Sequence, residues 1–253
     1  MLLSLPVGAI DVWDIPVDAP PKGATAQSLA LTAGAWERLP WKARAEKGRQ
    51  RIVSLARIAI LSRYAEATTW EQKQAISVDG RETPPATERV LRFSVSHSGD
   101  CMLLAVACDG RVGIDIERLR QGVRAENLAR RFFSEREGEG FFSLALDARE
   151  MAFFRTWVCK EAYLKAVGSG VGVPAGLRRF SVSVGADRPP AILHTELEPG
   201  GVTSFSLYDI DVPEGYVGAL AVEGTGHRIR YVDGKGHGAR ACGEAGSEMG
   251  QSM

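Results

Sequence analysis

Three strand-like segments between residues 90 and 117 constrain the fold of this chain more than any other feature. They are VLRFSVS, CMLLAVAC and RVGIDIE, and the short sequences HSGD and DG separate them. Short apolar runs bounded by Gly, Asp and Ser are typical of strands. The DG dipeptide predicts a tight hairpin between the second and third segments. We therefore expect an antiparallel sheet.

Helices and further strands are expected on both sides of these segments. The N-terminal MLLSLPVGAIDVWDIPVD has the composition of a first strand, and apolar residues recur with helical spacing between Trp36 and Tyr64. Residues 123–166 are predicted to be helical, and the strands FSVSV, SFSLYDIDV and YVGALAVEG follow. This order predicts an α+β fold in which the pattern occurs twice. Residues 233–253 lack Val, Ile, Leu and aromatic residues, which predicts a disordered tail.

The charge balance argues against one broad class of partner. The 253 residues include 31 Lys or Arg and 31 Asp or Glu, so the formal net charge is zero. Binding to nucleic acid or to a membrane surface usually requires a cationic excess. The charges are nevertheless segregated, because residues 36–63 carry a net charge of +6 and residues 187–223 one of −6. The basic segment suits a small anionic ligand.

The cysteines and the apolar runs predict a soluble, cytoplasmic protein. Cys101, Cys108, Cys159 and Cys242 show neither the spacing of a zinc site nor the density of a disulfide scaffold. Reduced thiols are therefore expected. No apolar run approaches the roughly 20 residues of a membrane-spanning helix. The N-terminal run also lacks the preceding Lys or Arg of a secretory signal.

Two carboxylates share one face of the third strand-like segment. Residues two apart in a strand point to the same side, so Asp115 and Glu117 point one way and Ile114 and Ile116 the other. The Cα atoms of the two acids are then about 7 Å apart, and their side chains can close on one hard cation. The alternative is an ordinary half-buried strand that turns its polar face to water.

A second candidate lies in the long helical segment, in the sequence WVCKEAYLK. Trp157, Glu161 and Lys165 follow one another at four-residue intervals and fall along one helical face, with Lys160 to its side. The alternative is a surface Glu–Lys pair, worth a few tenths of a kcal/mol, beside a tryptophan of the core.

The sequence FSVSHSG supplies a third candidate, because hydroxyls, backbone N–H groups and an imidazole at a strand end can bind phosphate. Alone, His97 is more simply a structural histidine, and Arg81 a solvated turn residue. Together, the three acids, the His-Ser loop and the basic side chains indicate Mg²⁺ and a phosphorylated substrate, since Mg²⁺ takes a few carboxylates together with phosphate oxygens.

In this order and spacing, the sequences FSVSHSG, GIDIE, FFS and WVCKEAYLKAVGSG resemble the motifs of the broad-specificity, Sfp-type 4′-phosphopantetheinyl transferases. The resemblance extends from about Arg49 to Gly170. It implies transfer of the 4′-phosphopantetheine arm of coenzyme A to a serine of an apo acyl or peptidyl carrier protein, with release of 3′,5′-ADP.

The resemblance also implies an architecture. Family members of this size are monomers of two similar α/β subdomains related by a pseudo-twofold axis, each an antiparallel sheet packed with a long helix. The active site lies in the cleft between them. The expected subdomains are residues 1–115, on the coenzyme A-binding side, and residues 116–232, on the metal and carrier-protein side.

Individual roles follow from the same resemblance. Asp115, Glu117 and Glu161 would bind Mg²⁺, and the catalytic residues would be Glu161, as the base, and Lys165, at the phosphate under attack. The side chains expected to bind coenzyme A are Arg49, Arg57, Arg81, Ser96, His97, Lys160 and Lys165. Carrier recognition is expected between residues 120 and 175, where four phenylalanines are either contacts or, more simply, core residues.

Two other functions fit the same residues. One is a Mg²⁺-dependent hydrolase of a phosphoanhydride, and the other is a non-catalytic module that binds coenzyme A or a carrier protein. A pure binding module would not need three carboxylates beside bound phosphates. The sequence leaves open which carrier protein is modified, and hence whether the pathway makes fatty acids, polyketides or nonribosomal peptides.

Overall fold

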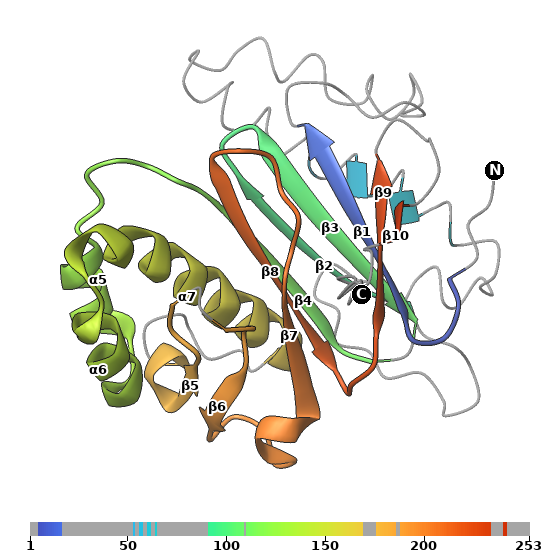
Figure 1. Ribbon diagram of the computed structural model, residues 1–253. Coiled ribbons are helices and arrows are strands. Elements are labelled where there is room, and N and C mark those ends of the chain that lie inside the picture. Colours follow the sequence, from blue (N-terminus) through green and yellow to red (C-terminus); the bar gives the residue numbers. More distant parts are fainter. Residues whose placement is uncertain are drawn as a thin grey trace, which may run out of the picture.

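The chain has an α+β fold, as predicted (Figure 1). The computed structural model describes residues 5–16, 91–108, 110–168, 176–185, 188–233 and 240–241, together with residues 53, 56, 57, 60, 61 and 64. Its larger elements are a five-stranded sheet, a three-stranded sheet and three α-helices.

Strand β3 (Cys101–Cys108) is an interior strand of the larger sheet, whose order is β10-β9-β1-β3-β2. All eight of its residues are buried, as expected for a strand that is covered on both faces. The other strands of this sheet are β1 (Ala9–Pro16), β2 (Leu91–Ser98), β9 (Arg228–Asp233) and β10 (Arg240–Ala241). The pair β1–β9 is parallel and the other pairs are antiparallel, so this sheet is mixed.

The smaller sheet is antiparallel and has the order β4-β8-β7. Its strands are β4 (Val112–Arg118), β7 (Phe205–Asp209) and β8 (Tyr216–Glu223). A separate pair consists of β5 (Phe180–Val182) and β6 (Ile192–Thr195), and two 3₁₀ turns are η2 (Leu177–Arg179) and η3 (Gly201–Ser204).

The three helices lie together on one side of the molecule, with α7 beside β4 and β8 (Figure 1). They are α5 (Ala125–Phe132), α6 (Glu135–Ser143) and α7 (Leu146–Val167). A capping box between Ser134 and Glu137 begins α6. Gly168 ends α7 in the left-handed conformation, with φ of 62°, as the glycines after the helical segment predict.

Apolar faces stack these elements into layers. Helical residues that include Ala56 and Ile60 cover one face of the larger sheet, and the other face packs on the smaller sheet through a core that includes Ile114 and Ile116. The outer face of the smaller sheet packs on α7. The layers are thus helix, sheet, sheet, helix, and the edge strands β2 and β4 of the two sheets lie side by side.

The predicted hairpin across the DG dipeptide is wrong. Strand β3 already has β1 on one edge and β2 on the other, so no edge is free for β4. The chain instead leaves β3 through Gly110, with φ of 119°, and β4 joins β8 in the other sheet. The hairpin of this region is β2–β3, across Gly99 and Asp100.

Three further observations refine the predicted elements. The helical segment 123–166 is divided into three helices at Phe133 and at Leu144, where the backbone is extended. Strands β6 and β9 were not predicted, and β9 returns to the larger sheet beside β1. Within the predicted tail, Arg240–Ala241 form β10, whereas residues 234–239 and 242–253 lie outside the described residues. Among the described helices, none is long and apolar enough to cross a membrane.

Candidate active site

The two acids of β4 lie on the face of the smaller sheet that α7 covers. Ile114 and Ile116 belong to the core between the two sheets. Asp115 and Glu117 alternate with them and therefore point to the opposite face. Asp115 pairs across the sheet with Ala219, which belongs to the core under α7. The strand pattern predicted from the sequence is thus confirmed, and the polar face is turned toward a helix.

Gly113 allows α7 to approach this face closely. A Cβ atom at this position would lie 2.5 Å from the backbone nitrogen of Ala166 and still nearer to the carbonyl oxygen of Ala162. Real Cβ atoms do not approach backbone atoms so closely, so only glycine fits without movement of the helix. Direct contact between strand and helix brings the turn of α7 that carries Glu161 and Lys165 beside Asp115.

Asp115 is the centre of a hydrogen-bonded cluster that joins three elements. Its Oδ1 atom accepts from Lys165 Nζ of α7 and from Ser96 Oγ of β2, both at 2.7 Å. Lys165 Nζ also donates to the carbonyl oxygen of Ile114 at 3.1 Å. The Oδ2 atom is buried and has no hydrogen-bond partner among the described residues. The cluster therefore leaves one buried carboxylate oxygen unsatisfied, which is unusual for a protein interior.

Glu161 lies in the electrostatic field of the β4 acids. Burial raises the pKa of the Glu161 carboxyl, the negative charges of Asp115 and Glu117 raise it further, and Lys165 opposes the shift. Glu161 is half-buried on the same helical face as Lys165. A carboxyl group with a raised pKa accepts a proton more readily than an ordinary glutamate, which suits a general base.

Glu117 is held by the next hydroxyl along β2. Ser98 Oγ donates to Glu117 Oε2 at 2.8 Å and accepts from the backbone N–H of Arg118 at 3.1 Å. The exposed side chain of Arg120 approaches the same carboxylate oxygen at 3.6 Å, which is a weak contact. Both acids of β4 are therefore bonded to serines of the neighbouring sheet.

The residues predicted to bind coenzyme A fall into two sets. Ser96 and Lys165 belong to the Asp115 cluster, as described above. His97 is exposed and, by strand alternation, shares the other side of β2 with Phe93. The Arg57 guanidinium lies over the Phe93 ring, 5.9 Å from its centroid, so Arg57 and His97 lie toward the same side. Arg49 and Arg81 lie outside the described residues.

The structure contradicts the expected contact between Lys160 and coenzyme A. The Lys160 side chain is fully buried, and its ammonium group donates to both carboxylate oxygens of Glu137, at 2.6 and 2.7 Å, and to the carbonyl oxygen of Phe180 at 3.0 Å. Lys160 lies one residue before Glu161, which turns its side chain away from the face that carries the site. Its role is to join α7 to α6 and β5.

Comparison with known proteins identifies the family. The 4′-phosphopantetheinyl transferase superfamily matches residues 111–221. The 4′-phosphopantetheinyl transferase HetI of Nostoc sp. is 32% identical over 240 residues, which are 90% of this chain and 94% of that protein. This chain belongs to the 4′-phosphopantetheinyl transferase superfamily.

Two further similar proteins match about half of the chain. The 4′-phosphopantetheinyl transferase psf-1 of Bacillus pumilus is 39% identical over 46% of this chain and 48% of that protein. Among solved structures, the holo-[acyl-carrier-protein] synthase of Thermotoga maritima shares 20% identity, with a TM-score of 0.35, over 47% of this chain and 66% of that chain.

The sequence predicts a Mg²⁺ site, and the chemistry of the residues fits that ion. Within the part of the chain that the structure describes, no group of three or more His, Cys, Asp or Glu side chains is arranged as a metal site. Mg²⁺, however, is usually bound by one or two carboxylates and completed by substrate phosphates and water. The buried, unpartnered Asp115 Oδ2 is an oxygen ligand of this kind, and Asp115 and Glu117 are both close enough to Glu161 to be coupled to it electrostatically.

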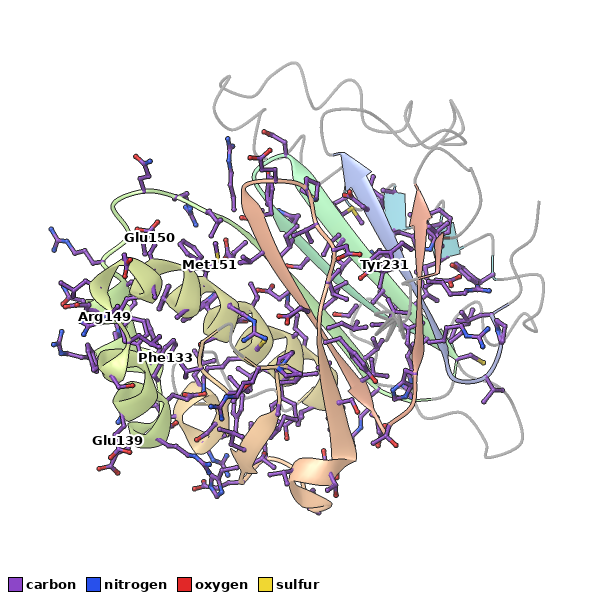
Figure 2. All side chains as sticks on the ribbon, viewed as in Figure 1. Phe133, Glu139, Arg149, Glu150, Met151 and Tyr231 are labelled. Atoms are coloured by element: carbon purple, nitrogen blue, oxygen red, sulfur yellow. The ribbon has the colours of Figure 1, made fainter. Side chains whose placement is uncertain are left out.

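Of the four phenylalanines expected to lie in the core or to contact the carrier, two are fully buried and two are half-buried. Phe133 and Phe141 are fully buried in the core among the three helices, where Figure 2 labels Phe133. Phe132 and Phe142 are only partly buried, and arginine side chains lie over their rings. The core interpretation holds for the first pair, and the second pair remains a candidate for carrier contacts.

Sequence reasoning missed three residues that shape the site of this transferase. They are Gly113, which allows α7 to approach; Ser98, which holds Glu117; and Glu137, which holds Lys160. The serines at 94, 96 and 98 alternate with Phe93, Val95 and His97, and this period of two in FSVSHS was a usable signal of a polar strand face. The capping box of Ser134 and Glu137 is a local signal for the start of α6, but nothing local marks Glu137 as the partner of Lys160 and Val182, which lie 23 and 45 residues away in sequence.

Proposed function

We propose that this chain transfers the 4′-phosphopantetheine group of coenzyme A to a serine hydroxyl of an apo acyl or peptidyl carrier protein, with Mg²⁺ as cofactor and 3′,5′-ADP as the second product. The observation that supports the proposal best is the Asp115 cluster, in which an unsatisfied buried carboxylate, a lysine and a half-buried glutamate converge. Its residues belong to segments that match a superfamily of such transferases.

The proposed reaction is an in-line displacement at the β-phosphorus of coenzyme A. The serine Oγ of the carrier forms a bond to this phosphorus, and the bond from phosphorus to the oxygen that bridges to the α-phosphate breaks. The electron pair stays on the leaving 3′,5′-ADP, and Glu161 accepts the serine proton. Such transfers depend mainly on positioning and on neutralisation of charge.

The chain's own groups divide this work. Lys165, whose ammonium group already lies at the site, binds the phosphate under attack and stabilises the negative charge on its oxygens. Glu161 is the proposed general base, because its half-buried carboxylate lies on the same helical face as Lys165 and is coupled electrostatically to Asp115 and Glu117. Asp115, Glu117 and Glu161 would hold Mg²⁺, which when bound neutralises charge on the pyrophosphate.

We propose that coenzyme A is bound by side chains on the two sides of β2. Ser96 contacts the phosphates from the cluster side, and His97 and Arg57 from the other side of the strand, with Arg49 and Arg81 as further candidates. We also propose that the larger sheet acts as the coenzyme A-binding half and the smaller sheet with its helices as the metal and carrier-binding half, with the site between them. The expected boundary between residues 1–115 and 116–232 then moves to the start of β4, and β9 belongs to the first half. The protein acts as a cytoplasmic monomer.

Mass spectrometry tests the function directly. The purified chain is incubated with coenzyme A, Mg²⁺ and an apo carrier protein, and the carrier is expected to gain the mass of phosphopantetheine. Asp115→Ala should reduce the rate by more than about 100-fold, the upper range for residues that only support a ligand. The matched control is Glu139→Gln, an exposed acid of α6 that points away from the site (Figure 2).

The other outcomes separate the rival functions. Cleavage of coenzyme A without modification of any carrier would replace the proposal with a phosphoanhydride hydrolase. Binding of coenzyme A without turnover would make the chain a binding module. Normal turnover of Asp115→Ala at saturating Mg²⁺ would remove Asp115 from the metal site.

A further inference from the structure

A row of serines joins the two sheets along their facing edges. Strand β2 is the last strand of the larger sheet and β4 the first of the smaller one, and no backbone ladder links them. The hydroxyls of Ser94, Ser96 and Ser98 instead reach across to β4, where they bond to Ile114, Asp115 and Glu117, respectively. Because these serines are two residues apart, they share one side of β2.

The three hydroxyls have different partners. Ser94 Oγ accepts from the backbone N–H of Ile114 at 3.0 Å, so it bonds to the strand itself. Ser96 and Ser98 donate to the carboxylates of Asp115 and Glu117. Ser94 therefore bonds only to the backbone of β4, whereas Ser96 and Ser98 bond to the two acids that are assigned to the metal.

Ser98 fixes the direction of its hydroxyl proton. A hydroxyl has a single proton to donate. Ser98 Oγ accepts from the N–H of Arg118, which occupies a lone pair, and directs its proton to Glu117 Oε2. Because Arg118 follows Glu117 on the same strand, this pair of bonds holds both the backbone and the side chain of the acid.

We propose that Ser98 is a positioning residue that orients Glu117 as a ligand for the divalent cation. The inference rests on the proposed function, since that function supplies the cation. Outer partners of this kind fix the orientation of a ligand, and their loss lowers metal affinity by about 10- to 100-fold. The bond crosses from one sheet to the other, so the orientation of Glu117 depends on the relative position of the two sheets.

Binding of Mn²⁺ to the full chain tests the inference without turnover. Free Mn²⁺ is measured by electron paramagnetic resonance during titration of the protein in the presence of coenzyme A. Ser98→Ala should weaken Mn²⁺ binding by about 10-fold or more. Ser98→Thr, which keeps the hydroxyl, should restore most of the affinity.

Ser94→Ala is the matched control, because it removes a hydroxyl of the same strand face that contacts no carboxylate. It should leave Mn²⁺ affinity within about 2-fold of the wild-type value, less than any supporting residue is expected to contribute. A double-mutant cycle compares the effect of Ser98→Ala on Mn²⁺ affinity with and without the Glu117 carboxylate. This comparison remains informative if the variants are somewhat less stable than the wild type. In the Glu117→Gln background, Ser98→Ala should have no further effect on Mn²⁺ affinity.

Several results would overturn the inference. These are unchanged Mn²⁺ affinity in Ser98→Ala, an equal loss in Ser94→Ala, or a full Ser98 effect in the Glu117→Gln background. Absence of Mn²⁺ binding by the wild type would overturn both the inference and the metal assignment. If the wild type modifies the carrier normally while Ser98→Ala binds Mn²⁺ normally, the proposed function stands and the inference fails. Mn²⁺ binding that depends on Ser98, in a chain that modifies no carrier, would leave the inference standing and refute the function.

Discussion

At position 113 the strand β4 has no side chain, and the backbone of α7 occupies that space. A methyl group there would meet the carbonyl oxygen of Ala162 and the nitrogen of Ala166, which are fixed backbone atoms. Gly113→Ala should therefore push α7 away from β4 and lower the free energy of unfolding by about 1–3 kcal/mol, the usual range for overpacking. It should also reduce turnover, because Lys165 and Glu161 move with the helix relative to Asp115.

Urea denaturation and carrier modification measure the two effects. Gly138→Ala is the matched control, since it lies in α6 with nothing within 4 Å of the added Cβ. The control should be neutral or stabilising by up to about 1 kcal/mol, because alanine favours a helix. Wild-type stability and turnover in Gly113→Ala would show that α7 adjusts without consequence for the site.

Individual residues of the site were predictable where local spacing determines the face. The alternation around Asp115 and Glu117, and the four-residue spacing of Glu161 and Lys165, correctly gave the side of each element that carries the acids. Spacing within one element could not predict which residue of another element each side chain contacts. The family resemblance implied that Lys160 binds coenzyme A, although its position one residue before Glu161 turns its side chain into the core toward Glu137.

Helices α6 and α7 and strand β5 are joined by one buried ion pair. Glu137 accepts from Lys160 and from the backbone N–H of Val182, and it also completes the capping box with Ser134. Burial lowers the pKa of the Lys160 ammonium, and the charge of Glu137 opposes that shift. The ammonium group is therefore stabilised in the core by the carboxylate that faces it.

Lys160→Met should be strongly destabilising, by about 3–5 kcal/mol, because it leaves the Glu137 carboxylate buried without its counter-charge. In Lys160→Met/Glu137→Gln the uncompensated charge is gone, while the amide oxygen still accepts from Val182 and the capping box loses one acceptor. The double variant should therefore be more stable than the sum of the two single losses predicts, with a coupling of about 0.5–3 kcal/mol. Urea denaturation of the four proteins measures the cycle, and strictly additive losses would contradict it.

The elements were predictable to different degrees for a physical reason. Strands such as β3 are apolar throughout, so their existence is visible in the sequence, but pairing depends on which edges remain free after folding. The DG turn after β3 was assigned to a hairpin, and the larger sheet had no free edge at that point. The short strand β6, with mixed burial, and the parallel strand β9 lack a comparable local pattern.

At the scale of the whole molecule, both ends of the described chain meet in one sheet. β9 pairs in parallel with β1 over Ala9–Asp14, and Val232 of β9 belongs to the core. The pairing carries a buried charge, because Asp11 of β1 is fully buried and accepts from Arg230 of β9, at 2.5 and 2.8 Å. Tyr64 Oη donates to the same carboxylate at 2.7 Å. Asp11 of β1 is thus bonded both to β9, through Arg230, and to Tyr64.

Truncation separates β9 from the residues that follow it. A chain that ends at Asp233 keeps β9 and loses β10, and we expect it to retain its melting temperature within a few degrees and its transferase activity. A chain that ends at Gly226 loses β9 and Arg230, which leaves the Asp11 carboxylate buried without a cation; that alone is worth about 3–5 kcal/mol. Since total stability is usually only about 5–15 kcal/mol, the shorter chain should fail to fold as a whole, including the site on the other sheet.

Circular dichroism melts and the carrier assay measure both chains, with Arg230→Met in the full chain to isolate the charge. Equal melting temperatures for the two truncations would show that β9 is dispensable, and loss of activity on ending at Asp233 would show that residues beyond it contribute to function.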